Sequence, residues 1–343
     1  NGTESKAIYG ENNSNLENTA SGIIEIRNSL SSSNPSIGMY GDSSTSISNS
    51  GLIDAGDNTI GVYGNQLAFT NTSNIKVGNE STGIYYLGNN LLLDGSITTG
   101  SLKSVGLYSV NGGTITNNLT SLIIGNSAYG IISTGTGTTN ITNNSSNVTI
   151  GDNSVFIYSS DTAGTITNNA NLTSASNKLY GLYGSGTIVN NGNIDYSTGI
   201  GNVGIYTTNG GNATNNATIS VGGSNTSTNS YGIGMVADSG SIARNNSTGI
   251  INVSGTNGTG MYVSGSGSKA INDGTINLSQ SGATGMYIEN GAEGINNGLI
   301  TTTGSGTNTV TGVALKSGGQ LTNNGTINID TNNGSGILNS GGV

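Results

Sequence analysis

Residues 181–208 read GLYGSGTIVNNGNIDYSTGIGNVGIYTT, and the chain repeats this arrangement throughout its 343 residues. The stretch opens on Gly181-Leu182-Tyr183 and closes on Gly204-Ile205-Tyr206, which are two copies of a Gly-aliphatic-Tyr element. Between them, residues 188–194 form a second element, in which two asparagines and a glycine separate aliphatic residues. The regular alternation of two short elements indicates a repeat architecture.

The Gly-aliphatic-Tyr element recurs fourteen times. Its first and last copies begin 329 residues apart, so the mean period is about 25 residues. The central residue is aliphatic in all fourteen copies, and tyrosine follows it in ten. The copies begin at Ala7, Gly38, Gly61, Gly83, Gly106, Gly130, Phe156, Gly181, Gly204, Gly234, Gly260, Gly285, Gly312 and Gly336.

The second element is a corner followed by a short strand. Its clearest copies span residues 166–172, 188–194 and 321–327. Asparagine and glycine tolerate the left-handed conformation that a tight corner requires. Apolar and polar residues then alternate, as in Val148-Thr149-Ile150 and Ile327-Asn328-Ile329. Alternation with a period of two is typical of a half-buried strand.

A period of about 25 residues with two or three short strands is that of one coil of a parallel β-helix. No segment carries the 3.6-residue pattern of a helical repeat, and a propeller blade needs about 40 residues. We therefore predict an all-β protein, a right-handed parallel β-helix (solenoid) of about 14 coils of roughly 25 residues. We expect residues 1–343 to form a single β-helical array, and to be a fragment of a longer protein because residue 1 is Asn.

Three columns of equivalent residues follow from stacking such coils. The central aliphatic residues of the first element, including all four methionines, should form one inward stack. The tyrosines that follow them should point outward. These tyrosines are either a structural ladder or an aromatic stripe on which sugars or a partner protein stack. The corner asparagines, among them Asn117, Asn143, Asn168, Asn190 and Asn215, should lie above one another and form hydrogen bonds between coils.

Composition excludes much familiar chemistry. The chain has no His, Cys or Trp, so it has no Ser-His-Asp triad, no Cys nucleophile, no His or Cys metal site and no disulfide. The calcium-binding glycine-aspartate repeat and the lysine of a P-loop are also missing. We predict no catalytic, cofactor-binding or metal-binding residues and no cofactor, and the sequence leaves the ligand-binding residues unknown.

Charge limits the partners that can be expected. The net charge is −9 with eight scattered basic residues, which argues against nucleic acid. The apolar runs are too short for a membrane-spanning helix, so this segment should not be embedded in a membrane. A polysaccharide-active β-helix would need clustered carboxylates. The nearest pairs, Asp54 with Asp57 and Glu289 with Glu293, are interpreted as solvated corners.

Two stretches interrupt the period. Residues 31–35 lengthen the first coil, and residues 222–229 enlarge a later one. Insertions in a solenoid emerge as loops on one face, which is often the binding face. Plain variation in loop length is the alternative interpretation.

The chain resembles the passenger repeats of type V autotransporters. The resemblance lies in STGIYY (81–86), SVGLYS (104–109), NVGIYT (202–207) and GTGMYV (258–263), which alternate with TITNN (165–169), TIVNNGNI (187–194) and QLTNNGTINI (320–329). It covers essentially the whole chain and is most like the large fusobacterial and Leptotrichia-type outer-membrane adhesins. It implies a secreted passenger held at the bacterial outer membrane. Such passengers act in adhesion and virulence.

The sequence and this resemblance together predict a structural and adhesive shaft of a bacterial surface or secreted adhesin, with no enzymatic activity. Its expected partners are a host cell-surface receptor or glycan, or other bacteria, and its expected location is the extracellular space or the cell surface. Two alternatives stay open. One is a subunit of a self-assembling extracellular filament that associates end to end, and the other is a polysaccharide-active β-helix enzyme.

Overall fold

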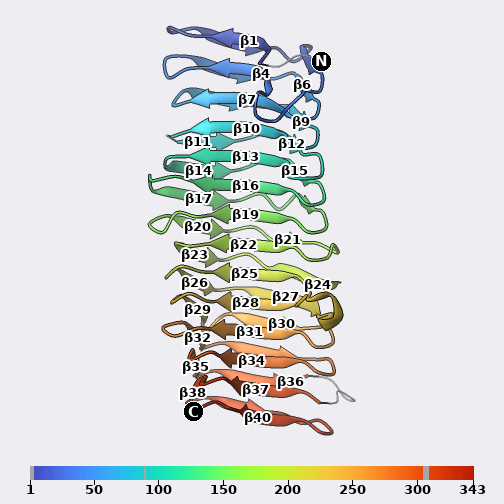
Figure 1. Cartoon of the computed structure of the whole chain (residues 1–343), viewed down its shortest axis with the longest axis vertical. Coiled ribbons are helices and arrows are strands. Elements are labelled where there is room, and N and C mark those ends of the chain that lie inside the picture. The colour runs from blue at the N-terminus through green and yellow to red at the C-terminus, as the bar shows by residue number, and fades with distance from the viewer. Residues whose placement is uncertain (1–3, 89, 304–308) are drawn as a thin grey trace. The chain divides into compact units, whose positions relative to one another are not determined.

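The computed structural model describes residues 4–88, 90–303 and 309–343. These residues form an all-β parallel β-solenoid of about 12 turns. They divide into two compact units, Asn1–Gly164 and Thr165–Val343. Within each unit, short strands stack one above another in three series (Figure 1). All the strand pairs that the structure describes between named strands of one unit are parallel, as expected when successive coils stack.

In the first unit, the three strands of a coil follow each other along the chain and join three different series. The first series is β1 (Lys6–Gly10), β4 (Ser36–Gly41), β7 (Thr59–Asn65), β10 (Thr82–Leu87), β13 (Val105–Val110), β16 (Tyr129–Thr134) and β19 (Val155–Ser159). The second is β2 (Asn15–Asn18), β5 (Ser46–Asn49), β8 (Ala68–Asn71), β11 (Leu91–Leu93), β14 (Gly113–Asn117) and β17 (Thr139–Asn143). This series forms two sheets, one of β2, β5 and β8 and one that contains β11, β14 and β17. The third is β3 (Ile23–Ile26), β6 (Leu52–Ala55), β9 (Asn74–Val77), β12 (Ser96–Thr98), β15 (Ser121–Ile124) and β18 (Val148–Ile150).

The second unit has the same three series. The first is β22 (Tyr180–Gly184), β25 (Val203–Thr207), β28 (Ile233–Ala237), β31 (Thr259–Ser264), β34 (Thr284–Glu289), β37 (Thr311–Lys316) and β40 (Ser335–Ser340). The second is β20 (Thr165–Asn168), β23 (Thr187–Asn190), β26 (Asn212–Asn215), β29 (Ile242–Asn245), β32 (Lys269–Asn272), β35 (Glu293–Asn296) and β38 (Gln320–Asn323). The third is β21 (Leu172–Thr173), β24 (Ile194–Ile200), β27 (Thr218–Gly223), β30 (Ile250–Val253), β33 (Thr275–Leu278), β36 (Leu299–Thr302) and β39 (Thr326–Asn328).

The fourteen copies of the Gly-aliphatic-Tyr element fall on the first series of the two units, seven copies in each. Neighbouring copies align residue on residue, as in Tyr40 with Tyr63 and Ile205 with Met235. The prediction that this element marks one strand per coil is therefore confirmed within each unit.

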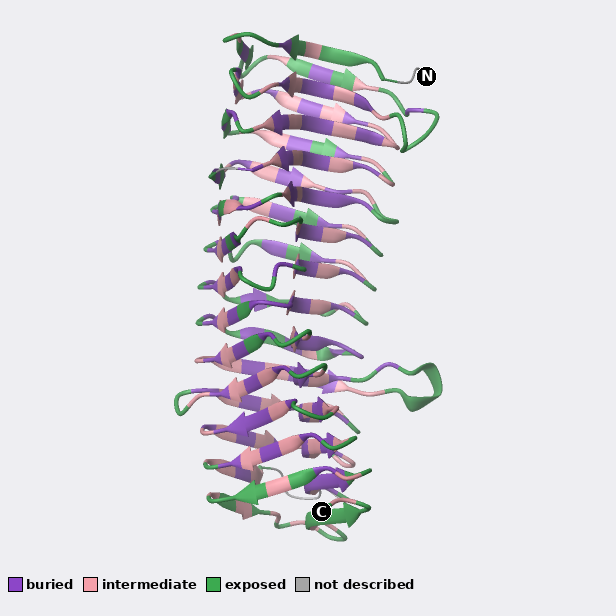
Figure 2. Ribbon diagram, turned by 60° about the vertical axis from the view of Figure 1, so that its left-hand side comes forward, coloured by how far each residue is buried: buried purple, intermediate pink, exposed green. Residues whose placement is uncertain are grey.

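The central aliphatic residues form the inward columns that the sequence predicts. Twelve of the fourteen are buried, and Ile205 and Met261 have no exposed surface. The two exceptions are Ile8, which is partly buried, and Ile337, which is 51% exposed. They lie in β1 and β40, each of which pairs with one described strand of its unit. For these two positions the prediction of a fully inward stack is wrong. Figure 2 shows that the buried residues concentrate on the strands and the exposed residues on the turns.

Glycine opens the element because the coils approach each other closely there. A Cβ atom built on Gly204 would lie 2.7 Å from the carbonyl oxygen of Gly234, in the neighbouring coil. A Cβ on Gly234 would in turn lie 2.6 Å from the oxygen of Gly260. Side chains at these positions would therefore force neighbouring backbones apart.

The corner asparagines form the predicted ladders. In the first unit, Nδ2 of Asn117 donates to Oδ1 of Asn143 at 2.7 Å. In the second unit, Asn168 donates to Asn190 and Asn190 to Asn215, both at 2.8 Å. All five side chains are completely buried. The asparagines therefore satisfy one another's amide groups inside the solenoid, which confirms the ladder prediction within each unit.

Candidate functional site

The tyrosines that follow the central aliphatic residues point outward, as predicted. In the first unit, Tyr9, Tyr40, Tyr63, Tyr85 and Tyr108 stack in order, with ring centroids 4.9–5.4 Å apart. Such contacts between offset rings add to the stability that burial supplies. Along this run of five rings, each inner tyrosine has a tyrosine on both sides. In this unit, this run of tyrosines therefore fits the interpretation as a structural ladder.

The corresponding column in the second unit is interrupted. Tyr183 and Tyr206 lie 4.7 Å apart, and Tyr262 and Tyr287 lie 5.7 Å apart. Val236 occupies the position between these two pairs, because it aligns with Tyr206 on one side and with Tyr262 on the other. We call the space over Val236, between the rings of Tyr206 and Tyr262, the Val236 gap. One side of each of these rings has no tyrosine of the column against it.

The longer of the two inserted loops lies beside this gap. The insert, Gly222–Asn229, contains a single turn of 3-10 helix, η1 (Thr226–Thr228). The Oδ1 atom of Asn225 accepts a hydrogen bond from the backbone N–H of Ser227 and so caps this turn. Asn225 and Ser230 also exchange backbone hydrogen bonds of 2.7 and 3.0 Å, which close the loop at its base. The insert is therefore held in one shape before any partner arrives.

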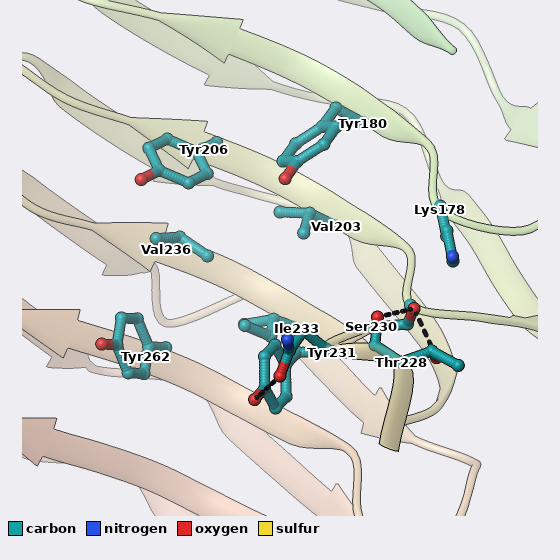
Figure 3. Close-up of a pocket in the computed structure, with 12 residues that line it drawn as sticks. Lys178, Tyr180, Val203, Tyr206, Thr228, Ser230, Tyr231, Ile233, Val236 and Tyr262 are labelled. Carbon is teal, nitrogen blue, oxygen red and sulfur yellow. Dashed lines mark hydrogen bonds between the residues drawn. The ribbon is translucent and has the colours of Figure 1, made fainter. Parts of the chain in front are cut away.

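The insert and the interrupted column enclose a cavity of about 380 Å³. In Figure 3, Tyr206, Val236 and Tyr262 lie one below another, and Tyr231 and Thr228 approach from the insert side. Tyr180 and Val203 contribute the upper wall. The residues that line the cavity are Lys178, Tyr180, Gly201, Val203, Tyr206, Thr228, Asn229, Ser230, Tyr231, Ile233, Val236 and Tyr262.

A second cavity, of about 470 Å³, lies against the same insert. It shares Tyr231, Ile233 and Tyr262 with the first cavity. Its other lining residues are Ser224, Thr226, Asn257, Thr259, Thr284, Tyr287 and Glu289. The shared residues make the two cavities parts of one elongated depression, which we call the insert groove.

Two carboxylates hold the tyrosines of the groove. The hydroxyl of Tyr206 donates to Oδ2 of Asp238, and that of Tyr262 donates to Oε1 of Glu289, both at 2.5 Å. Burial and the Glu289 carboxylate together raise the pKa of Tyr262 to about 12. Burial and Asp238 raise the pKa of Tyr206 further still. Both phenols are therefore neutral at physiological pH, and each has lone pairs left to accept a hydrogen bond.

The other insertion, residues 31–35, also borders a hollow. That hollow measures about 460 Å³ and is lined by Leu30, Ser31, Ser32, Asp57, Asn58, Asn79, Glu80 and Leu102. It contains no aromatic ring, and two of its lining residues are acidic. Of the two insertions, only the second therefore combines a preformed loop with aromatic side chains.

The acidic pairs of the sequence belong to local contacts. Asp54 forms an ion pair with Lys76 at 3.3 Å, while Asp57 accepts a hydrogen bond from the backbone N–H of Asn79. Glu293 forms an ion pair with Lys269 at 2.7 Å. Each of these carboxylates has a partner in an adjacent coil, but Asp54 lies within β6 and Glu293 within β35, so their interpretation as corner residues is wrong.

Within residues 4–88, 90–303 and 309–343, no three acidic side chains come together in a group able to hold a metal ion. None of the helices in those ranges is long and apolar enough to cross a membrane.

The insert and the outward tyrosines Tyr206, Tyr262 and Tyr287 are predictable from the sequence, whereas the other lining residues are not. Tyr180 and Tyr231 stand outside the Gly-aliphatic-Tyr element, so the repeat gave no reason to select them. The signal that was available is the substitution of Val236 for tyrosine in the copy that directly follows the insert. Where the tyrosine column is interrupted next to an enlarged coil, the outer surface of the solenoid differs from that of the other coils.

Comparison with known proteins gives one family. The family model described as the BigA third pectate lyase-like domain matches residues 119–296. The matched range includes the insert and both cavities that adjoin it. No curated protein and no solved structure matches the chain.

Proposed function

Because the chain belongs to the family of the BigA third pectate lyase-like domain, we propose that it is a segment of a bacterial surface adhesin-type passenger. BigA is an autotransporter-type adhesin. The family and the β-solenoid fold both support a location outside the cell or at the cell surface. Within this proposal the passenger is secreted, acts in virulence and is of the fusobacterial and Leptotrichia type. Its solenoid winds right-handed in 14 coils.

The proposed activity is adhesion through the insert groove. The observation that carries it is the cavity of about 380 Å³ between Tyr206, Tyr262 and the insert. The tyrosine column is interrupted at Ile132 as well as at Val236, but only the interruption at Val236 adjoins the insert and this cavity. The partner would be a host cell-surface receptor or glycan, or another bacterium. Binding at one groove would be weak, and display of many copies on a cell would strengthen it.

We also propose that the segment has no enzymatic activity. Some proteins with many parallel coils cleave polysaccharides, and that chemistry needs a pair of carboxylates on opposite sides of the scissile bond. The two cavities of the groove are lined by a single carboxylate, that of Glu289, which accepts the hydroxyl of Tyr262. The lining therefore supports binding rather than hydrolysis.

An adhesion assay tests the proposal. Beads coated with the chain would be added to host epithelial cells and, separately, to other bacteria, and bound beads would be counted. Deletion of residues 222–229 should abolish most of the adhesion. Deletion of residues 31–35 is the matched control, because it removes the other insertion and leaves the tyrosine gap intact. Equal adhesion by both deletion variants and the unchanged chain would make this segment a spacer.

A further inference from the structure

We propose that the Val236 gap binds one pyranose ring of a neutral oligosaccharide, and that the insert groove binds the sugars next to it. This inference deepens the proposed function, because it names the chemical class that the adhesive surface would recognise. It rests on the spacing of the interrupted column, on the chemistry of the lining and on the position of the few charges.

The spacing suits one inserted ring. Neighbouring strands of a sheet lie about 4.8 Å apart, so Tyr206 and Tyr262, which are two strands apart, are separated by about 9.6 Å. In the same column, ring centroids that are in contact lie 4.7 and 5.7 Å apart. A ring placed over Val236 would therefore lie at stacking distance from both tyrosines. Val236 is only 3% exposed, so the side chains around the gap must move apart to admit the sugar ring.

The lining has the two kinds of surface that a pyranose needs. A sugar ring presents C–H groups on its faces and hydroxyl groups around its edge. The faces of Tyr206 and Tyr262 can take the C–H groups, with Val203 and Ile233 as apolar neighbours. Hydroxyl and amide groups for the edge come from the insert and the next coils, namely Ser224, Thr226, Thr228, Asn229, Ser230, Asn257, Thr259 and Thr284.

The tyrosine hydroxyls are oriented as acceptors. Because each donates its proton to a carboxylate, Tyr206 to Asp238 and Tyr262 to Glu289, each phenol oxygen can act only as an acceptor toward a further partner. A sugar hydroxyl can donate to such an oxygen. The carboxylates thus fix both the position of the rings and the direction of the hydrogen bonds that they offer.

Charge favours a neutral sugar over an ion. The cavity at the gap has one charged lining residue, Lys178, and the second cavity has one, Glu289. A cationic ligand would need carboxylates at the rings, but the carboxylates of Asp238 and Glu289 already accept the tyrosine protons. An anionic sugar would meet Glu289 and a chain of net charge −9. Neutral hydroxyl and amide groups dominate the lining between these charges.

The groove is long enough for a chain of sugars. Its two cavities, of about 380 and 470 Å³, share Tyr231, Ile233 and Tyr262. Cavities of this size are typical of ligand sites that enclose a small molecule. Tyr287 extends the aromatic surface beyond Tyr262, with its ring 5.7 Å away. An oligosaccharide would therefore run from the gap along the second cavity, past the edges of Tyr262 and Tyr287.

The experiment uses the full chain and a printed panel of oligosaccharides. The panel carries neutral glucose, galactose, mannose and N-acetylglucosamine hexasaccharides beside uronic-acid and sialylated oligosaccharides. Binding to at least one neutral hexasaccharide is expected. Failure to bind any neutral sugar, or preference for the charged ones, would overturn the inference.

The decisive variant is Val236→Tyr, which restores the tyrosine that ten other copies carry and so fills the gap. Binding to the neutral sugar should weaken at least tenfold while thermal stability is kept. Ile132→Tyr is the matched control, because Ile132 occupies the same position in the first unit, aligned with Tyr108 and Tyr158. It should leave binding unchanged. Equal affinity in both variants would contradict the gap as the site.

Tyr231→Ala provides a second test that does not depend on repacking. Tyr231 is 47% exposed and lies two residues after the insert, so loss of its side chain should leave the solenoid folded. Weaker sugar binding is expected, and unchanged binding would contradict the insert as part of the site. The panel is also independent of the cell assay. Cell adhesion without any glycan binding would defeat the inference alone, whereas glycan binding without adhesion would defeat the proposed function.

Discussion

Asn190 donates from Nδ2 to Oδ1 of Asn215 at 2.8 Å, although 25 residues separate the two in the chain. Both side chains are completely buried. Asn190 also accepts from Asn168, so it is an internal member of a hydrogen-bonded ladder. The hydrogen bonds between asparagine side chains therefore follow the same repeat of about 25 residues as the strands. These buried amides hold the register of one coil on the next.

Substitution of Asn190 should reveal how much the ladder contributes. Asn190→Ala leaves the facing amide groups of Asn168 and Asn215 with fewer partners in a dry interior. We expect a loss of about 2–4 kcal/mol in the free energy of unfolding. Asn191→Ala is the matched control, since Asn191 bonds to Asn169 on the exposed surface and should cost less than about 1 kcal/mol. If urea denaturation gives equal losses in the free energy of unfolding for both variants, the buried ladder contributes no more to stability than the exposed hydrogen bond.

The inward aliphatic column predicts the effect of a buried charge. Ile205 has no exposed surface and aligns with Leu182 and Met235 in the neighbouring coils. Ile205→Asp should lower stability by about 3–5 kcal/mol, because an unpaired carboxylate enters the core. Asn212→Asp adds the same charge at an exposed position and should have little effect. Unchanged melting of the Ile205 variant would refute the inward assignment.

The close approach of the coils predicts an effect at glycine. A Cβ on Gly204 would lie 2.7 Å from a backbone oxygen of the next coil, so Gly204→Ala should cost roughly 1–3 kcal/mol. Gly336 holds the same place in its element, but the nearest atom to its Cβ would be 3.9 Å away. Gly336→Ala should therefore be nearly neutral. Thermal unfolding of the two variants distinguishes crowding from a general intolerance of alanine.

The tyrosines of the groove predict a dependence on alkaline pH. Folding raises the pKa of Tyr262 from its ordinary value of 10 to about 12. Below pH 10 the phenol is neutral in both states, and its contribution to stability is complete. Between pH 10 and 12 only the unfolded state loses the proton, so the free energy of unfolding should fall as pH rises. Tyr262→Phe should make this fall shallower in denaturation series at fixed ionic strength, and an identical slope would contradict the assigned role of burial and Glu289.

The repeat made much of the fold predictable, because each coil carries the same pattern of inward aliphatic, outward aromatic and corner asparagine residues. Gly-aliphatic-Tyr placed Ile205 inside and Tyr206 outside, and the corner element placed Asn190 in its ladder. Burial of Tyr86 and Tyr196 was not predicted. Both stand outside the recurrent columns, and their positions depend on the local volume of single coils. The exposure of Ile337 was also not predicted, because the column pattern gives every copy the same inward position.

The site was less predictable than the fold because it depends on departures from the repeat. Tyr231 and Val236 are separated by only five positions, yet Tyr231 follows the insert and Val236 interrupts the tyrosine column. Their joint effect appears only when the strands are stacked, because Tyr262 completes the cavity from the next coil. The stacking of successive coils brings the insert and the interruption at Val236 together, and the groove forms between them.

The most direct measurement of the adhesive role compares beads that carry Val236→Tyr with beads that carry Ile132→Tyr, counted on the same cells. Both changes extend a tyrosine column, but only the first fills the gap beside the insert. If the insert groove is the contact, the Val236 variant loses most of its adhesion and the Ile132 variant adheres like the unchanged chain. Full adhesion by the Val236 variant would contradict this and place the contact elsewhere.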